Sequence, residues 1–265
     1  MQFTKTVLQV LREQQSVVHF ESELKFIKQH NGLRPGEIHL ILGPVGEGKT
    51  TLNRTIIIDF LVNNPTEKIL LWLSEETEAK YAAELSRSLV NHFERIEFVS
   101  ERTMEGIDSE KTFFERMAQE IKSSGAKLVF FDNITTSKCY GNRKNADQSR
   151  VADPFKKFAE KMDIAVMLIA HTKKGVHSGG GALIDSDDIR GDATIVNVAE
   201  FLYILQQFRC NDEKQGTIRI TKHRGQDIEN STFFLEYNRM GRFYCQARQV
   251  TFDEFKKNYA KRDKL

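Results

Sequence analysis

Cysteine is scarce in this sequence, and neither a paired cysteine motif nor a long apolar run is present. The 265 residues include only Cys139, Cys210 and Cys245, which lie far apart in the chain. An odd number of isolated cysteines argues against a disulfide scaffold, and the missing C-x-x-C spacing argues against a zinc site. We therefore expect a protein of a reducing compartment such as the cytoplasm.

Strong charge of one sign is also missing. The 39 Lys and Arg residues nearly balance 37 Asp and Glu residues, so the formal net charge is only +2. A global basic field for nucleic acid is excluded, and any site for a polyanion must be local. No segment approaches the roughly 20 apolar residues that cross a bilayer, so we expect no membrane partner.

Apolar runs alternate with helical patterns over the first two thirds of the chain. Helices are predicted over residues 49–63, 77–91, 111–123 and 148–162, and strands over 37–42, 69–73, 128–132 and 164–170. Continuous apolar strands between helices predict a mostly parallel central sheet that is flanked by helices on both faces. Ligands of such sheets bind at the carboxyl ends of the strands.

After residue 199 the pattern changes to consecutive strands, predicted over 201–205, 217–221, 232–237 and 243–245. These should form antiparallel hairpins that extend the sheet. The predicted fold class is therefore α/β. The organisation that we expect is a helical arm, which packs either on its own core or on a neighbouring subunit, then one α/β domain and a basic tail, over residues 1–30, 31–250 and 251–265.

A glycine-rich loop joins the first predicted strand to the first long helix. Its pattern is G-x-x-x-x-G-K-T, in which backbone N–H groups wrap around a phosphate. A Cβ at Gly43 or Gly48 would crowd the ligand. The lysine of this pattern binds the β- and γ-phosphates, and the threonine offers its hydroxyl to Mg²⁺. The loop and the residue after it are predicted to bind a nucleotide with Mg²⁺: Gly43, Pro44, Val45, Gly46, Glu47, Gly48, Lys49, Thr50 and Thr51.

Polar residues follow three other predicted strands. Asp132 ends the strand over 128–132, where a second carboxylate would hold the water shell of Mg²⁺. Glu75 and Glu76 follow the strand over 69–73, and one of them should orient the attacking water as a base. We assign Glu76 to this role and keep Glu75 as the alternative. His171 ends the next core strand and could sense the γ-phosphate.

An ordered set of segments carries a family resemblance: GPVGEGKTT, LLWLSEET, LVFFDN, LIAHTKKG, DIRGDATIVNVAE and ITKHRGQ. Together they resemble the RecA-like motor domain of replicative hexameric DNA helicases, over roughly residues 33–245. The helicase half of phage primase-helicases is the nearest group, with DnaB-type and small plasmid ring helicases close by. The resemblance implies a RecA-like P-loop NTPase that hydrolyses ATP, a hexameric ring, single-stranded DNA as ligand, and a primase or helicase loader as partner.

The resemblance also implies where DNA binds. The segment that begins at Lys173 and the segment over residues 187–191 would face the central channel of the ring. There a few cations repeated around the ring would hold the phosphates of a single strand. The two segments place Lys173, Lys174, Arg190 and the backbone N–H groups near Gly191 against the DNA.

In the same family a K-x-R pair on a late strand reaches the ATP of the adjacent subunit. The resemblance therefore makes Arg224 an arginine finger in trans, with Lys222 as its companion. A guanidinium near the γ-phosphate stabilises charge that develops in the transition state. Tyr237 matches the aromatic residue that stacks on the base, whereas Gln207 stands where the phage enzymes have a second base-packing residue, an arginine.

The functional prediction is an ATP-dependent motor that translocates on single-stranded DNA as a hexameric ring. Two alternatives stay open. The first is an ATP-switched DNA-binding protein, such as a recombination mediator, in which nucleotide controls assembly rather than unwinding. The second is an accessory ATPase of the same RecA-like class that does not contact DNA.

Overall fold

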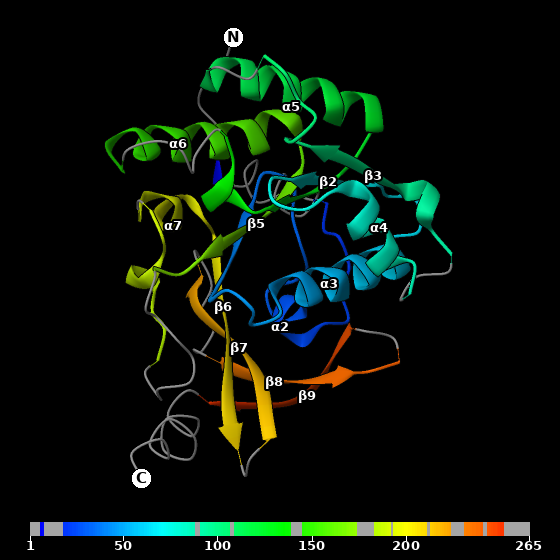
Figure 1. Ribbon diagram of the computed structural model, residues 1–265, viewed down its shortest axis with the longest axis vertical. Helices are drawn as coiled ribbons and strands as arrows, with labels where there is room; N and C mark the ends of the chain where they lie inside the picture. Colours follow the sequence, from blue (N-terminus) through cyan, green and yellow to red (C-terminus); the bar gives the residue numbers. More distant parts are fainter. Residues whose placement is uncertain are drawn as a thin grey trace.

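A nine-stranded sheet forms the centre of the protein in the computed structural model (Figure 1). Its strand order is β3-β2-β4-β5-β1-β6-β7-β8-β9. The structure describes residues 6–7, 18–87, 91–106, 109–138, 145–173, 183–191, 193–210, 213–223, 231–240 and 243–251.

The first six strands pair in parallel, as the alternating pattern predicted. One of them, β3, was not predicted. It combines buried and half-buried positions because it lies at the edge of the sheet, and its sequence lacks a continuous apolar run. The parallel strands are β1 (Ile38–Gly43), β2 (Ile69–Leu73), β3 (Ile96–Ser100), β4 (Leu128–Asp132), β5 (Ala165–His171) and β6 (Phe201–Cys210).

The last strands form the predicted antiparallel extension, in which β6, β7, β8 and β9 pair in sequence order. These strands are longer than the apolar runs indicated, since polar residues continue each hairpin beyond the core. The antiparallel strands are β7 (Glu213–His223), β8 (Ser231–Asn238) and β9 (Phe243–Thr251).

Helices cover both faces of the sheet (Figure 1). Alternate strand residues point to opposite faces, so Leu40 and Leu42 pack toward α5, α6 and α7, whereas Ile41 packs toward α3 and α4. The short α7 was not predicted. The helices are α2 (Lys25–Lys28), α3 (Lys49–Asn63), α4 (Glu78–Leu85), α5 (Glu110–Ser124), α6 (Asn145–Met162) and α7 (Thr194–Val198), with 3-10 turns at Phe93–Arg95, Ile134–Thr136 and Ser186–Asp188.

The described part of the N-terminal region packs on the core of its own chain. Phe20, Phe26, Ile27 and Leu33 are buried in the same cluster as the apolar residues of α3. The Phe20 and Leu33 backbones also bond to each other in both directions, with N···O distances of 2.7 and 3.1 Å. Residues 1–5 and 8–17 of the predicted arm, and 252–265 of the predicted tail, lie outside the described residues.

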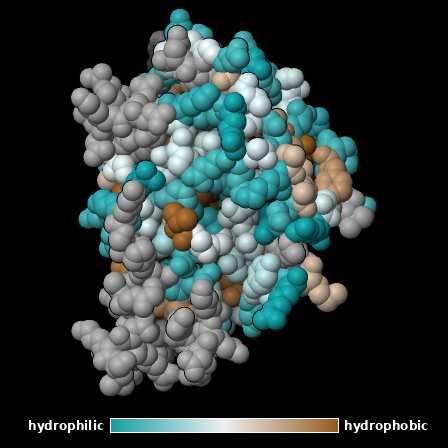
Figure 2. All heavy atoms as spheres, viewed as in Figure 1, coloured by the Kyte–Doolittle hydropathy of each residue, from teal (hydrophilic) through white to brown (hydrophobic). Residues whose placement is uncertain are grey.

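The surface agrees with a core that is well covered. The face shown in Figure 2 is mainly hydrophilic, and its hydrophobic residues are few and separated. Among the helices of the described segments, none combines the length and the apolar character that a membrane span requires.

Candidate nucleotide-binding site

The predicted site residues come from four strands that are adjacent in the sheet. The order β2-β4-β5-β1 places the carboxyl ends of these strands at one edge, because all four run in the same direction. Gly43, Asp132 and His171 are the last residues of β1, β4 and β5, and Glu75 follows β2. The parallel topology therefore brings together residues that are up to 128 positions apart in the sequence.

The glycine-rich loop joins β1 directly to α3. Gly46 and Gly48 have φ values of +82° and +91°, a left-handed conformation that glycine adopts without strain. A Cβ at Gly43 would lie 2.7 Å from the carbonyl oxygen of Leu205, and a Cβ at Gly48 would collide with the hydroxyl of Tyr244. Crowding at both glycines thus comes from the protein itself as well as from the expected phosphate.

Lys49 is a buried cation at the start of α3. Its Nζ donates to the carbonyl oxygens of Gly43 and Pro44, each at 2.7 Å. Burial lowers the pKa of Lys49 to about 8, while the charges of Asp132 and Glu75 act in the opposite direction. A buried ammonium held by neutral loop carbonyls, at the N-terminus of a helix, fits the phosphates of a nucleotide.

Asp132 supplies the carboxylate expected for Mg²⁺. Its Oδ2 accepts a hydrogen bond of 3.1 Å from Nδ2 of Asn53 on α3. Burial raises the pKa of Asp132 to about 7, and the charge of Glu75 adds to this effect. A carboxylate in such surroundings favours a bound cation. The described residues contain no group of three acidic, histidine or cysteine side chains that could hold a metal ion. Mg²⁺ in proteins commonly keeps several waters and is bound through one or two carboxylates together with phosphate oxygens, and Asp132 offers a carboxylate of this kind.

His171 lies between two partners that compete for the same ring nitrogen. Its Nε2 is 3.2 Å from Oε1 of Glu75 and 2.7 Å from Nδ2 of Asn133. The Asn133 amide is oriented by Thr136, whose N–H donates to Oδ1. Nε2 must carry a proton to bond Glu75 and must lack one to accept from Asn133, so the two contacts favour different tautomers.

The two adjacent glutamates have different surroundings. The hydrogen bond from His171 is the main cause that lowers the pKa of Glu75 to about 2, so this carboxylate is ionised at neutral pH. Glu76 instead forms an ion pair with Lys80, one helical turn along α4, with Oε1 and Nζ 2.5 Å apart. The two glutamates thus differ in their contacts, since Glu75 meets His171 at the strand ends and Glu76 pairs with Lys80.

The segments predicted to bind DNA are attached to the end of β5. The backbone N–H of Arg190 donates to the carbonyl oxygen of His171 at 2.8 Å. The N–H of Lys173 donates to the carbonyl oxygen of Asp188 at 2.7 Å, and Thr172 forms an antiparallel bridge with Ile189. Arg190 is exposed and Gly191 is half-buried. Lys174 lies outside the described residues.

Lys222, on β7, is held by its own chain. Its Nζ donates to the carbonyl oxygens of Val196 and Asn197 at the end of α7. Lys222 therefore lies beside α7 and opposite Leu202 at the start of β6, away from the strand ends that carry Lys49. Arg224, the predicted arginine finger, lies outside the described residues.

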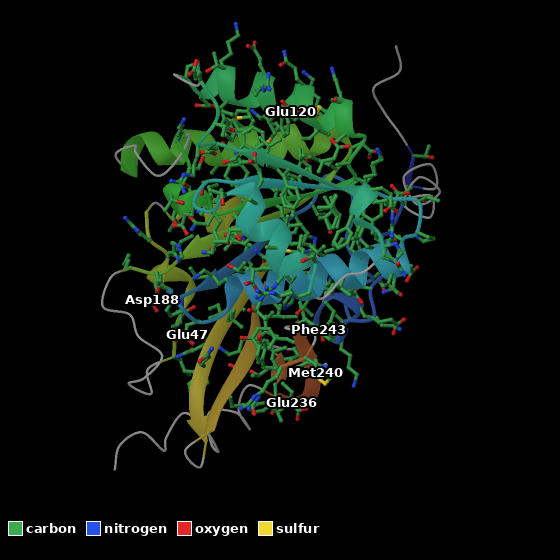
Figure 3. The ribbon with its side chains drawn as sticks, turned by 45° about the vertical axis from the view of Figure 1, so that its right-hand side comes forward. Glu47, Glu120, Asp188, Glu236, Met240 and Phe243 are labelled. Carbon is green, nitrogen blue, oxygen red and sulfur yellow. The ribbon has the colours of Figure 1, made fainter. Side chains whose placement is uncertain are left out.

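Tyr237 lies on β8 and is 49% exposed. Its ring meets the ring of Tyr244 edge-on, with centroids 5.9 Å apart, and Tyr244 in turn covers Gly48. An exposed aromatic face near the start of α3 is compatible with the predicted base stacking. Figure 3 shows the outer part of this hairpin, with Met240 in the turn and Phe243 at the start of β9.

A second link joins the loop to the hairpins. The backbone N–H of Gln207 donates to Oε2 of Glu47 at 2.9 Å, and Nε2 of Gln207 donates to the Glu47 carbonyl at 3.2 Å. Sequence reasoning did not assign these contacts, nor the roles of Asn133 and Tyr244. Asn133 follows Asp132 directly at a strand end, which is a signal that could have identified it. Nothing local marks Tyr244.

Comparison with known proteins agrees with this geometry. The family model described as an AAA domain matches residues 22–176, more than half of the chain. A KaiC-like protein from the hyperthermophilic archaeon Pyrococcus horikoshii OT3 has a similar structure, with a TM-score of 0.64 and 14% sequence identity. The alignment covers 88% of this chain and 99% of that protein. No curated protein matches the sequence.

The family match contains the glycine-rich loop and the ends of β1, β2, β4 and β5, which are the elements that build the site. The structural likeness extends over the antiparallel strands and shows the fold. The chain therefore belongs to the AAA domain family, and it has the RecA-like fold of P-loop ATPases.

Proposed function

We propose that this chain is an ATP-hydrolysing motor that assembles into a hexameric ring and translocates on single-stranded DNA. One observation carries the proposal. The His171 ring contacts Glu75 at the nucleotide end, and the His171 carbonyl accepts the hydrogen bond of Arg190. The predicted sensor of the γ-phosphate and the predicted DNA-binding segment therefore meet at a single residue.

In this proposal, separate residues at the nucleotide end bind the phosphates, hold the metal ion and orient the attacking water. Lys49 binds the phosphates, and Thr50 and Asp132 hold Mg²⁺, which when bound neutralises charge on the phosphates. Glu75 is ionised at neutral pH because its pKa is held at about 2, so its carboxylate can accept a hydrogen bond from the attacking water and orient it. In this proposal Glu75 takes the role that the sequence assigned to Glu76.

The DNA end is coupled to this chemistry through His171. Loss of the γ-phosphate changes the charge near Glu75, and the His171 ring can then exchange its contact with Glu75 for the one with Asn133. The backbone of the same residue holds Arg190, so a shift of His171 moves the segment that carries the cation. Around a ring, Arg190, Lys173 and Lys174 would pass DNA phosphates from subunit to subunit.

The antiparallel half supplies the contact between subunits in this proposal. Lys222 and Arg224 would reach the ATP of the adjacent subunit from the end of β7, and Tyr237 would stack on the base. The bonds of Lys222 to the end of α7 support its part of the strand, and Arg224 follows two residues later. A primase or a helicase loader is the partner that such a motor would need.

The proposal is tested by the effect of DNA on ATP hydrolysis. Arg190→Ala should leave basal ATPase activity within about twofold of wild type and reduce its stimulation by a single-stranded oligonucleotide about tenfold, since phosphate contacts dominate such binding. The matched control is Arg116→Ala, which removes an exposed arginine from α5. Native mass measurement with nucleotide should show a six-subunit particle. ATPase activity that ignores the oligonucleotide, in a protein that forms no ring, would overturn the proposal.

A strand-displacement assay separates the motor from its two alternatives. A ring motor should displace a strand. A few Arg224→Ala subunits mixed into the wild-type protein should abolish this strand displacement. DNA-stimulated hydrolysis without displacement would indicate an ATP-switched DNA-binding protein. An accessory ATPase would keep every activity when Lys173→Ala and Arg190→Ala are combined.

A further inference from the structure

A buried arginine of β7 holds the segment that carries Arg190. The guanidinium of Arg219, which is only 5% exposed, donates through Nη2 to the carbonyl oxygen of Ile184. The backbone N–H of Ile184 in turn donates to Oε1 of Gln206 on β6 at 3.2 Å, and Gln206 is fully buried. Two buried polar side chains from neighbouring strands therefore bond the two backbone groups of one loop residue.

These two bonds fix one end of the short segment over residues 184–190. Its other end is held at β5, where Ile189 forms a bridge with Thr172 and the N–H of Arg190 donates to the carbonyl oxygen of His171. The segment is thus tied to the β6–β7 hairpin where it begins and to the nucleotide end of the sheet where it ends. The exposed Arg190 side chain lies at the second of these ends.

Stability alone is a poor reason for an arginine at this position. Burial lowers the pKa of Arg219 to about 10, although the charge of Asp185 acts in the opposite direction, so the buried guanidinium has lost part of its solvation. Arg219 lies opposite Ile204, a fully buried residue of the apolar core, where an apolar side chain would pack as well. The arginine instead fixes the backbone at Ile184.

The strand β7 makes a second contact of the same kind. Its register against β6 shifts so that Arg219 lies opposite Ile204 and Lys222 lies opposite Leu202. Leu202 and Ile204 belong to the same core cluster, so the shift brings to one face two cations whose spacing of three residues would otherwise direct them to opposite faces. Lys222 bonds backbone carbonyls at the end of α7. The strand therefore holds the chain both before and after Arg190.

We propose that Arg219 and Gln206 are positioning residues that set where Arg190 meets the phosphates of single-stranded DNA. With its start fixed at Ile184, the segment can turn about that point but cannot slide along the hairpin. A shift of the His171 backbone then changes the position of Arg190 rather than being lost in a movement of the whole loop. This inference rests on the proposed function, because it assigns the DNA contact to Arg190.

The test measures the anisotropy of a fluorescent single-stranded oligonucleotide in the presence of a non-hydrolysable ATP analogue. Arg219→Met keeps an unbranched side chain but removes the donors. It should raise the Kd about tenfold and weaken the salt dependence of the Kd as much as Arg190→Ala does, because a phosphate contact is lost. Arg219→Lys retains a donor and should restore most of the affinity. Gln206→Leu should raise the Kd in the same direction as Arg219→Met.

A double variant shows whether Arg219 acts through Arg190. In an Arg190→Ala background, Arg219→Met should have no further effect on the Kd, since the contact that it positions is already gone. Ile220→Val is the matched control. It shortens a fully buried side chain of the same strand, in the cluster on the opposite face, so it lowers the thermal midpoint without reaching the segment. Its Kd should equal that of wild type.

Thermal unfolding shows whether each variant is folded, and Gln206→Leu carries the test should Arg219→Met fail to fold. An unchanged Kd in the folded variant overturns the inference. So does an effect of Arg219→Met that is equally large with and without the Arg190 side chain, because the two residues would then act separately.

Hydrogen exchange without DNA separates this inference from the proposed function. Arg219→Met should speed the exchange of amides over residues 184–190 and leave that of α5 unchanged. Faster exchange there, in a protein whose wild type does not bind the oligonucleotide, would refute the proposed motor and leave the anchoring of the segment standing. Tight binding by wild type that Arg219→Met does not alter would do the reverse.

Discussion

The parallel and antiparallel halves of the sheet place their polar residues in different ways. In the parallel half, four neighbouring strands end at one edge, and Lys49, Glu75, Asp132 and His171 meet there. In the antiparallel half, strand ends alternate between the two edges, so polar residues are spread along the hairpins, as the half-exposed Tyr237 is. The parallel half therefore gathers its polar residues at one place, whereas the antiparallel half distributes them along its length.

The largest expected effect tests the parallel half. Glu75→Gln should reduce the ATPase rate by at least about 100-fold, because it removes the carboxylate that orients the attacking water while keeping the shape of the side chain. Glu76→Gln should stay within about threefold of wild type, since this carboxylate pairs with Lys80 at the surface. Steady-state hydrolysis, with nucleotide binding measured in parallel, checks both. The reverse order of the two variants would restore the assignment made from the sequence.

A smaller effect tests whether the antiparallel half acts on a neighbour. Lys222→Ala should reduce DNA-stimulated hydrolysis about tenfold and leave nucleotide affinity nearly unchanged. The loss is smaller than the roughly 100-fold expected for a donor at the transition state, because Lys222 is only the companion of Arg224. Lys138→Ala, which removes an exposed lysine that also bonds a backbone carbonyl, is the control. If Lys222→Ala only lowers the thermal midpoint, the ammonium serves α7 of its own chain and no other subunit.

Tyr237→Ala should raise the KM for ATP about fivefold with little change in kcat, because stacking on a base contributes about 1–3 kcal/mol and this half-exposed ring falls at the lower end. Tyr237→Phe should retain the wild-type KM, since the stacking ring remains. Phe93→Ala removes an exposed ring far along the sheet at its β3 edge and controls for general effects. Equal KM values for Tyr237→Ala and wild type would mean that the base binds elsewhere.

The smallest effect concerns stability where the N-terminal region meets the core. His30 and His39 share the hydroxyl of Tyr203, at 2.5 and 3.0 Å. Burial, aided by His39, lowers the pKa of His30 from 6.5 to about 2. The unfolded chain therefore takes up a proton near pH 6.5 that the folded chain refuses until about pH 2. Stability is full above pH 6.5 and is lost as the pH falls from there.

Denaturant unfolding between pH 8 and pH 4 measures this loss. Below pH 6 the free energy of unfolding of wild type should fall more steeply than that of His30→Gln, by up to about 1.4 kcal/mol per pH unit for one proton. His19→Gln, which changes an exposed histidine of the same region, should keep the wild-type slope. Parallel slopes for wild type and His30→Gln would show that another group controls the acid response.

The structural elements that follow from a local sequence pattern were predictable. The glycine-rich loop, the strands that lead to Asp132 and His171, and the change to hairpins after residue 199 are all confirmed as structural elements. The edge strand β3 and the short α7 were missed because neither has a continuous apolar run or a clear helical period. The choice between Glu75 and Glu76 could not be made from type or position, since adjacent residues differ only in the direction of their side chains.

The sequence by itself determined which groups could do chemistry. The loop pattern and the polar residues at the ends of apolar runs are local features, which depend only on residues a few positions apart. Only the tertiary structure decided which groups meet. Glu75 finds His171 across 96 positions, Asn53 finds Asp132 across 79, and Tyr244 covers Gly48 from the far end of the chain. Such contacts depend on strand order and on the orientation of each side chain. Many different pairs of residues that are distant in the sequence could meet in this way, so the sequence alone does not identify the pairs that do.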